Sequence, residues 1–184
     1  VAGHICLDIT PQFHSNRAGD FSELLSPGKL INIGDAALSI GGAVCNTGLA
    51  LAKLGADIKL NGKLGNDHFG KIIMDLLGEG GAGSFKVVEG QSSSYSIVIA
   101  VPGVDRIFLH NPGTNDTFTA DDIDMDALDG CDLFHFGYPT LMKQMFINKG
   151  EQLSQMYRQV NDKDIITSMD ITLPDPESKS GKVN

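Results

Sequence analysis

The sequence predicts an α/β fold built on a mainly parallel sheet, and three observations support this prediction. Apolar runs of strand character alternate with helical periodicity along residues 1–77, which favours a parallel sheet. The 22 glycines among 184 residues suit a fold with many tight turns. Residues 41–55 read GGAVCNTGLALAKLG, a glycine loop followed by an apolar helix that ends on glycine.

The first elements follow in a regular order. Residues 1–9 and 31–40 are expected to be strands, with a polar, turn-rich excursion over 13–28 between them. The first helix is expected over residues 44–54, a short strand over 58–63 and a second helix over 69–77. This order places the glycine loop between a strand and a helix.

The second part of the chain first departs from this alternation and then returns to it. Residues 93–101 and 106–110 are rich in β-forming residues and are separated by the turn sequence PGVD, which predicts an antiparallel hairpin. Residues 133–137 read as a buried strand, 140–160 as largely helical and 165–170 as a further strand. The polar segment 174–184 interrupts the pattern, so we expect a sheet with an open edge.

Composition narrows the function classes. A formal net charge of −9 disfavours nucleic acid as a partner, and no apolar run is long enough to suggest a membrane span. Cys6, Cys45 and Cys131 are odd in number and widely spaced, which predicts reduced core thiols in a cytoplasmic protein. No targeting segment is visible, although the chain starts abruptly within a strand, which leaves room for an upstream residue or two.

The acidic cluster invites a calcium interpretation that the loop rule rejects. Its members are Asp121, Asp122, Asp124, Asp126, Asp129 and Asp132. Ala127 stands where a calcium loop needs glycine, and Leu133 stands where it needs glutamate. We therefore expect solvated acidic residues around a helix start. The five histidines show no paired spacing either, so no metal site is expected.

A glycine run over residues 78–83, GEGGAG, superficially fits a dinucleotide fingerprint. It follows a predicted helix instead of a strand, so the context that the fingerprint needs is missing. We expect a flexible loop there.

Candidate binding residues gather around the first strand and the glycine loop. Asp8 is near the C-terminal end of the strand, where open α/β sheets collect ligands, and its carboxylate can accept two hydroxyls; a turn cap is the alternative. Gly41 and Gly42 let the backbone approach a ligand. Asn46 can donate and accept hydrogen bonds; it can also cap the helix, and the two roles can coexist.

Four segments resemble, in the right order, those of the ribokinase-like (PfkB) carbohydrate kinases. Residues 41–55 look like the family's GG-x-x-x-N helix, and residues 1–8 (VAGHICLD) look like its first strand with a substrate-binding aspartate. Residues 62–70 (GKLGNDHFG) look like its G-x-x-G-x-D-x-x-G turn, and residues 106–115 (RIFLHNPGTN) look like a later strand with its PGAN-type loop. The resemblance implies a ribokinase-like Rossmann-type sheet flanked by helices, with a small β lid.

The resemblance also implies an activity, which is the ATP- and magnesium-dependent phosphorylation of a sugar hydroxyl. Residues 1–184 would form the N-terminal, substrate-binding part of one domain, in which Asp8, Gly41, Gly42 and Asn46 contact the sugar. Lid strands within about 9–40 and 92–113 would cover the sugar and pair with a second subunit, which implies a homodimer.

Four residues on the second pair of lid strands are possible lid contacts. They are Tyr95, Ile97, Phe108 and His110. Alternate positions would face the sugar and the others solvent or a second subunit, and the residues alone do not say which face is which. For His110, a surface or hairpin-core role is the alternative to substrate contact.

Some features of the family have no counterpart in this sequence. The N-x-x-E segment and the T-x-GAGD motif, which carries the catalytic base, are not found, so we expect the fold to be incomplete at its C-terminus and the chain alone to be inactive. Residues 81–84, GAGS, offer serine where a carboxylate base is needed. Asp170 resembles an aspartate near the site of some members, although the asparagine and arginine of that pattern are missing.

Other functions remain open at this stage. A nucleoside kinase of the same family would share these motifs. A non-catalytic sugar-binding or dimerisation module would need no nucleotide site. A dinucleotide-binding oxidoreductase is a third alternative, which stabilisation by a nicotinamide cofactor would reveal.

Overall fold

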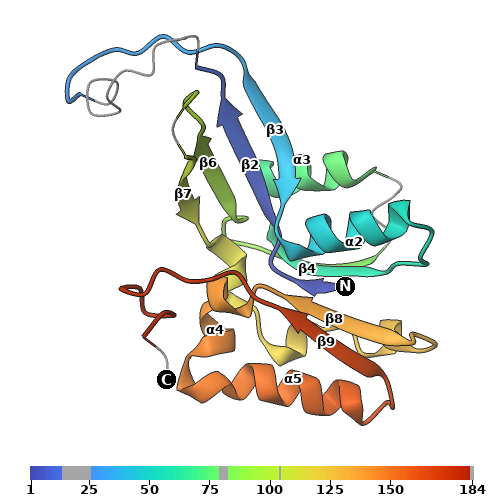
Figure 1. Ribbon diagram of the computed structural model, residues 1–184. Coiled ribbons are helices and arrows are strands. Elements are labelled where there is room, and N and C mark those ends of the chain that lie inside the picture. The colour runs from blue at the N-terminus through green and yellow to red at the C-terminus, as the bar shows by residue number, and fades with distance from the viewer. Residues whose placement is uncertain (14–25, 79–82, 104, 183–184) are drawn as a thin grey trace.

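The chain forms two sheets, and the computed structural model describes residues 1–13, 26–78, 83–103 and 105–182 (Figure 1). The first sheet has five strands in the order β5-β4-β1-β8-β9, and the second has four in the order β3-β2-β6-β7. The predicted excursion over 13–28 and the predicted loop over 78–83 fall largely outside the described residues.

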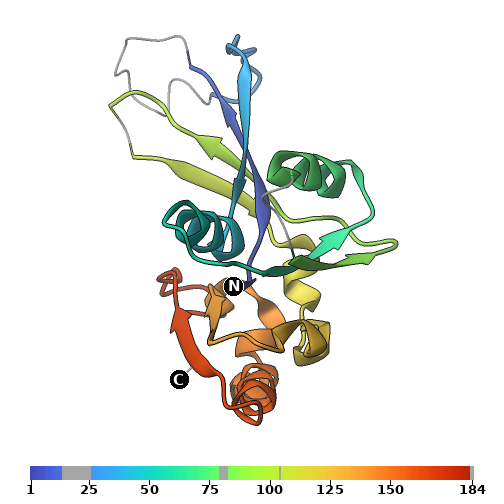
Figure 2. The ribbon, with the colours of Figure 1, turned by 90° about the vertical axis from the view of Figure 1, so that its right-hand side faces the viewer.

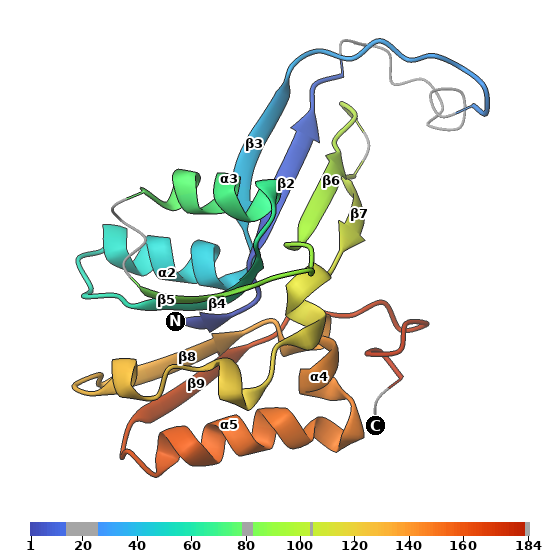
Figure 3. The ribbon, with the colours of Figure 1, turned by 180° about the vertical axis from the view of Figure 1, so that it is seen from behind.

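The five-stranded sheet is parallel throughout. Its strands are β1 (Ala2–Gly3), β4 (Leu60–Gly65), β5 (Gly83–Val88), β8 (Leu133–Gly137) and β9 (Ile166–Asp170). Its helices are α2 (Ala43–Lys53), α3 (His68–Leu77), α4 (Lys143–Phe146) and α5 (Glu151–Asn161). Figure 3 shows α5 running along β8 and β9 on the side away from α2 and α3.

Two apolar cores lie on the two faces of this sheet. One centres on Phe134 and Phe136 of β8, which pack with Met156 and Val160 of α5. The other joins Leu60 and Leu64 of β4 to apolar side chains of α2 and α3, and it continues into the second sheet. The predicted α/β class and the parallel sheet are therefore confirmed.

The four-stranded sheet rises away from the first (Figure 2). Its strands are β2 (Cys6–Pro11), β3 (Ala36–Gly41), β6 (Tyr95–Ile99) and β7 (Ile107–Asn111). β2 pairs with β6 in parallel, whereas the pairs β2–β3 and β6–β7 are antiparallel, so the predicted hairpin is confirmed. Short 3-10 helices are η2 (Gly113–Thr117), η3 (Ala120–Asp122), η4 (Asp126–Leu128), η5 (Pro139–Leu141) and η6 (Asn148–Gly150).

The single strand predicted over residues 1–9 is wrong, because the chain leaves the first sheet after Gly3 and enters the second at Cys6. Gly3 has a φ of 125°, and the backbone of Gly137 occupies the space that a side chain there would need. At this break, the backbone carbonyl of Ile5 accepts a hydrogen bond from the side-chain amide of buried Asn115 at 2.9 Å. The apolar run over residues 1–9 gives no sign in the sequence that the chain changes sheet.

Three other predictions need correction. The helical segment predicted over 140–160 is interrupted between α4 and α5, where Asn148, Lys149 and Gly150 all have positive φ angles that an α-helix does not allow. Gly83, assigned to a loop, begins β5 and lies so close to the backbone of Leu60 that no side chain would fit. The strand expected over 31–40 is shorter, since β3 begins at residue 36.

The acidic cluster is not wholly solvated, because Asp122 is buried with its side chain 2% exposed. It pairs with Lys63 at 2.8 Å and Lys86 at 2.6 Å, and it accepts the backbone N–H of Thr119 at 2.8 Å. The two ammonium groups hold the pKa of Asp122 below its usual range against the desolvation that opposes this shift. Through these two ion pairs, the carboxylate connects η3 to strands β4 and β5.

Replacing Asp122 with alanine should destabilise the fold strongly. Lys63 would remain buried without its counter-ion, and removing one partner of a buried pair costs about 3–5 kcal/mol. Urea titration followed by circular dichroism measures the loss in the free energy of unfolding. Asp121→Ala changes an exposed neighbour and serves as the control; equal stability of the two variants would contradict the assignment.

Candidate functional site

Asp8 lies in the middle of β2 and not near the end of its strand, on the face of the second sheet opposite Leu7 and Ile9, which pack in the core shared with α3. The turn-cap alternative therefore does not apply. The absent side chain of Gly41, on the neighbouring strand, leaves the space that the Asp8 carboxylate occupies. The thiol of Cys6 donates to Asp8 Oδ1 at 3.5 Å, and burial raises the pKa of Cys6 and raises that of Cys45 to about 12. Both thiols remain protonated beside the carboxylate.

Gly42 caps the start of α2 in a conformation that requires glycine. Its φ is 86°, and the carbonyl and ring of His4 fill the position of a Cβ atom. Asn46 therefore does not cap the helix, since Gly42 holds that position. Asn46 lies exposed in the first turn of α2, near the backbone amides at which a helix start binds polar groups.

The strand register decides which lid residues share a face with Asp8. Ser39, Asp8, Ser96 and His110 are paired side by side across β3, β2, β6 and β7, so their side chains form one row on one face. Phe108 lies two residues from His110 on the same face and is 53% exposed.

Tyr95 and Ile97 alternate with this row and lie on the opposite face. The ring of Tyr95 packs against Phe69 of α3, with 4.9 Å between ring centroids. The structure therefore does not bring these two possible contacts together with Asp8, whereas it does bring Phe108 and His110 to the same face.

A chain of polar contacts connects this row to the junction between the sheets. His110 Nδ1 is 3.0 Å from Ser96 Oγ, and His110 Nε2 is 3.4 Å from His4 Nε2. His4 is 2% exposed, and desolvation, reinforced by His110, lowers its pKa to about 3. Desolvation also lowers the pKa of His110, despite opposing effects of Asp8 and Asp116. Both imidazoles are neutral at pH 7.

Asp170 ends β9 at the C-terminal edge of the parallel sheet. Its carboxylate lies beside Gly137 and Ala43, so it approaches the first turn of α2. His135 Nε2 is 3.5 Å from Asp170 Oδ1, and Ser168 holds the other ring nitrogen at 2.8 Å. The structure thus places Asp170 at the same edge as the glycine loop.

Sequence reasoning missed four residues around this site. His4 and Asn115 lie at the break between β1 and β2, and Ser39 and Ser96 flank Asp8 in the row. The NPGTN segment signals a special loop at Asn115, but no pattern reveals a break inside an apolar run or the register of three strand pairs.

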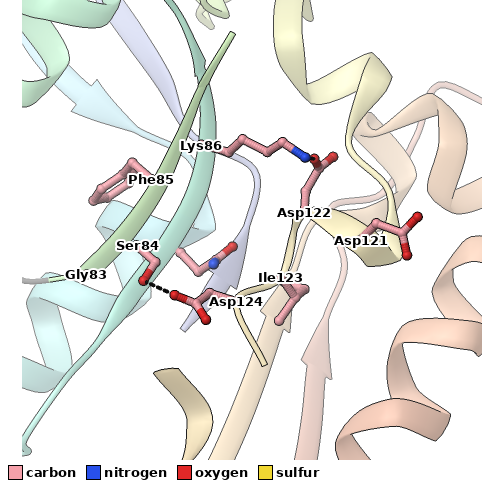
Figure 4. Close-up of a pocket in the computed structure, with 9 residues that line it drawn as sticks. Gly83, Ser84, Phe85, Lys86, Asp121, Asp122, Ile123 and Asp124 are labelled. Atoms are coloured by element: carbon pink, nitrogen blue, oxygen red, sulfur yellow. Dashed lines mark hydrogen bonds and ion pairs between the residues drawn. The ribbon is translucent and has the colours of Figure 1, made fainter. Parts of the chain in front are cut away.

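A separate hollow lies at the amino-terminal ends of β4 and β5 (Figure 4). It measures about 480 Å³, and Ser84 donates to Asp124 at 2.9 Å across one side of it. Open α/β sheets bind ligands at the opposite, carboxyl edge, where the glycine loop lies and beyond which β2 carries Asp8. We therefore take the Asp8 face, and not this hollow, as the candidate site.

The described residues contain no group of three His, Cys, Asp or Glu side chains placed to hold a metal ion. Within the same ranges, no helix has the length and apolar character needed to cross a membrane.

Comparison with solved structures identifies the fold. A fructokinase from Xylella fastidiosa superimposes with a TM-score of 0.72 over 99% of this chain and 56% of its own, at 19% identity, and it has also been solved with bound ATP. An adenosine kinase from Sinorhizobium meliloti gives 0.68 over 91% of this chain and 54% of its own, also at 19% identity. Identities this low show the fold alone, which is that of the ribokinase-like kinases.

Sequence comparison gives the family. Residues 6–178 match the pfkB family carbohydrate kinase, and the chain belongs to that family. Fructokinase-1 of Zea mays is 29% identical over 56% of this chain and 33% of its own length. An uncharacterized sugar kinase of Archaeoglobus fulgidus is 36% identical over 47% of this chain and 35% of its own. These matches therefore span about a third of the length of each relative.

The buried histidine gives the fold a measurable pH dependence. An unfolded histidine titrates near 6.5, whereas His4 stays neutral in the fold down to about pH 3. The unfolded state therefore binds more protons below pH 6.5, and the free energy of unfolding should fall by about 2 kcal/mol between pH 7 and pH 5. His110 contributes in the same direction.

Denaturant titrations at the two pH values measure this loss. His4→Leu should remove most of it, whereas His68→Leu, an exposed control at the start of α3, should keep it. An unchanged pH dependence in His4→Leu would contradict the account.

Proposed function

We propose that this chain supplies the acceptor side of an ATP-dependent sugar kinase, with Asp8, Gly41, Gly42 and Asn46 contacting the sugar. The observation that supports this most is the Asp8 carboxylate in the open face of the second sheet, beside Gly41 of the glycine loop. A carboxylate accepts hydrogen bonds from sugar hydroxyls without reacting with them. The names of the relatives, which include a fructokinase and a sugar kinase, point to the same substrate class.

The residues of the site would orient the acceptor hydroxyl and exclude water from it. Asp8 would hold hydroxyls by charge-assisted hydrogen bonds, and backbone amides at the start of α2, next to Gly42, would face the acceptor. The second sheet would act as the lid, with Phe108 and His110 facing the sugar. Excluding water in this way favours transfer to the sugar over hydrolysis of ATP.

ATP and magnesium would be the cofactors, and the fructokinase from Xylella fastidiosa, which shares this fold, binds ATP in its crystal structure. We place the nucleotide site and the catalytic base outside this chain, because its sequence offers no T-x-GAGD motif. Asp170, at the edge of the sheet, remains a candidate for a supporting role near the site. The chain by itself should not transfer phosphoryl groups.

A nucleoside kinase is the second candidate. The likeness to an adenosine kinase favours it, and exposed Phe108 on the Asp8 face offers a surface on which a base could stack. A homodimer through the lid would cover the exposed Leu38 and Leu109, which lie on the face opposite Asp8. The three free cysteines fit a reducing compartment, and we place the protein in the cytoplasm.

Steady-state kinetics of the whole protein test this proposal. Asp8→Ala should lower kcat/KM for the sugar by on the order of 100-fold, since a hydrogen bond to a charged group contributes about 1.5–3 kcal/mol. Asp105→Ala, an exposed control near the tip of the lid hairpin, should leave it unchanged. Equal activity of the Asp8 variant and the wild type would refute the proposed site. ADP formation by the 184-residue chain alone would refute the proposal that the nucleotide site lies outside this chain.

A further inference from the structure

Three polar side chains of β8 and β9 are connected in series near the carboxyl edge of the parallel sheet. His135 pairs with Ser168, and Gly137 pairs with Asp170, in the register of these two neighbouring strands (Figure 3). All four positions therefore lie on one face of the sheet, opposite the core that α5 covers. This is the face on which α2 begins, with Ala43 beside the Asp170 carboxylate.

The ring of His135 lies between a hydroxyl and a carboxylate. Its Nδ1 atom is 2.8 Å from Ser168 Oγ, and its Nε2 atom is 3.5 Å from Asp170 Oδ1. A carboxylate oxygen only accepts, so we assign the ring proton that faces it to Nε2. In the neutral ring, Nδ1 then accepts the hydroxyl proton of Ser168. The two contacts together fix the orientation of the ring.

The two oxygens of Asp170 have different surroundings. Oδ1 and the Nε2 atom that faces it are both buried, and neither makes a hydrogen bond elsewhere in the described residues. Catalytic contacts of this length are common in sites without a ligand and shorten when the ligand binds. The Asp170 side chain is nevertheless 39% exposed, and since Oδ1 is buried, this exposure lies on the side of Oδ2. His135 therefore faces Oδ1 and leaves Oδ2 open to a ligand.

Tyr138 connects the end of β9 to the base of the lid. Its N–H donates to the Asp170 carbonyl at 3.2 Å, and its ring lies 6.2 Å from the ring of His4, which is packed under Gly42. Tyr138 has φ 62° and ψ 43°, a left-handed conformation that a bulky side chain rarely adopts. Backbone strain of this kind is concentrated at active sites. These contacts place Asp170 beside the elements that the proposed function assigns to the acceptor.

The chemistry of Oδ2 favours the acceptor over ATP as its partner. A carboxylate oxygen can accept a hydrogen bond from a sugar hydroxyl. The phosphate oxygens of ATP are themselves acceptors and carry negative charge, so they would be repelled by the carboxylate. An acceptor hydroxyl is therefore the group that Oδ2 can bind.

We infer that His135 is a positioning residue of the proposed kinase site: Ser168 holds its ring, and the ring fixes Asp170 through Oδ1 so that Oδ2 contacts an acceptor hydroxyl. His135 does not contact the acceptor itself, because its side chain is only 13% exposed and both ring nitrogens face other side chains. The inference rests on the proposed function and extends its site to β8 and β9, outside the lid.

A double-mutant cycle on the whole protein tests whether His135 acts through Asp170. The acceptors are a panel of sugars that contains D-fructose and D-ribose, with ATP and magnesium. Asp170→Ala should lower kcat/KM for the best sugar by at least about tenfold, the scale of one hydrogen bond. His135→Leu should lower it by about the same factor, and the double variant no further than Asp170→Ala, because residues that act through one contact are not additive.

Two results of the cycle would overturn the inference. One is full activity of Asp170→Ala. The other is a double variant in which the two losses multiply, to about 100-fold or more, as they do for residues that act independently. A residue that only supports the strand would give this second result.

Two further comparisons separate positioning from general damage to the strands. Ser168→Ala removes the hydroxyl that holds the ring and should lower kcat/KM, whereas Thr167→Ala, its neighbour on β9 that faces the other side of the sheet, should not. His135→Gln keeps an N–H that can reach Asp170 and should lose less than His135→Leu. Equal losses within either pair would overturn the inference. These milder variants decide the question if thermal unfolding shows that His135→Leu does not fold.

The Asp8 variant separates this inference from the proposed function. A loss in Asp8→Ala together with full activity in the Asp170 and His135 variants would overturn the inference alone. If the whole protein phosphorylates no sugar of the panel, the proposed function itself is overturned.

Discussion

Close backbone packing at the junction of the two sheets is the constraint on which the rest of the structure depends. The backbone of Gly137 leaves no room for a side chain on Gly3, whose φ of 125° lies where the chain leaves the first sheet. Ala43 and the Asp170 carboxylate leave no room for a side chain on Gly137. Gly42 leaves room for His4, and Gly41 for the Asp8 carboxylate. Without these contacts, β2 could not rise above the carboxyl edge of the sheet with Asp8 on its open face.

The molecule uses charge in two opposite ways. On one side, buried Asp122 pairs with buried Lys63 and half-exposed Lys86 and connects a short helix to the sheet. At the base of the lid, His4 and His110 are held neutral and connected through ring nitrogens. The first arrangement supports the fold far from the candidate site. The second places a neutral histidine in the same row of side chains as the Asp8 carboxylate.

Periodicity and turn residues in the sequence predicted most helices and strands. The features that they did not predict depend on contacts between distant parts of the chain. The strand at 133–137, the lid hairpin and the helix after the glycine loop all follow from periodicity and turn residues. The change of sheet after Gly3 and the start of β5 at Gly83 depend on distant backbone, which no local window contains. The strand and the glycine loop indicated Asp8 and the two glycines, and the family motifs supported them. The face on which Tyr95 lies follows only from the pairing register.

A crystal structure of the whole protein with a bound uncharged sugar is the most direct test of the central claim, which is that the Asp8 face receives the acceptor. The account predicts at least one sugar hydroxyl within about 3.2 Å of the Asp8 carboxylate. A sugar bound only in the hollow beside Ser84 and Asp124, with the Asp8 face empty, would contradict it.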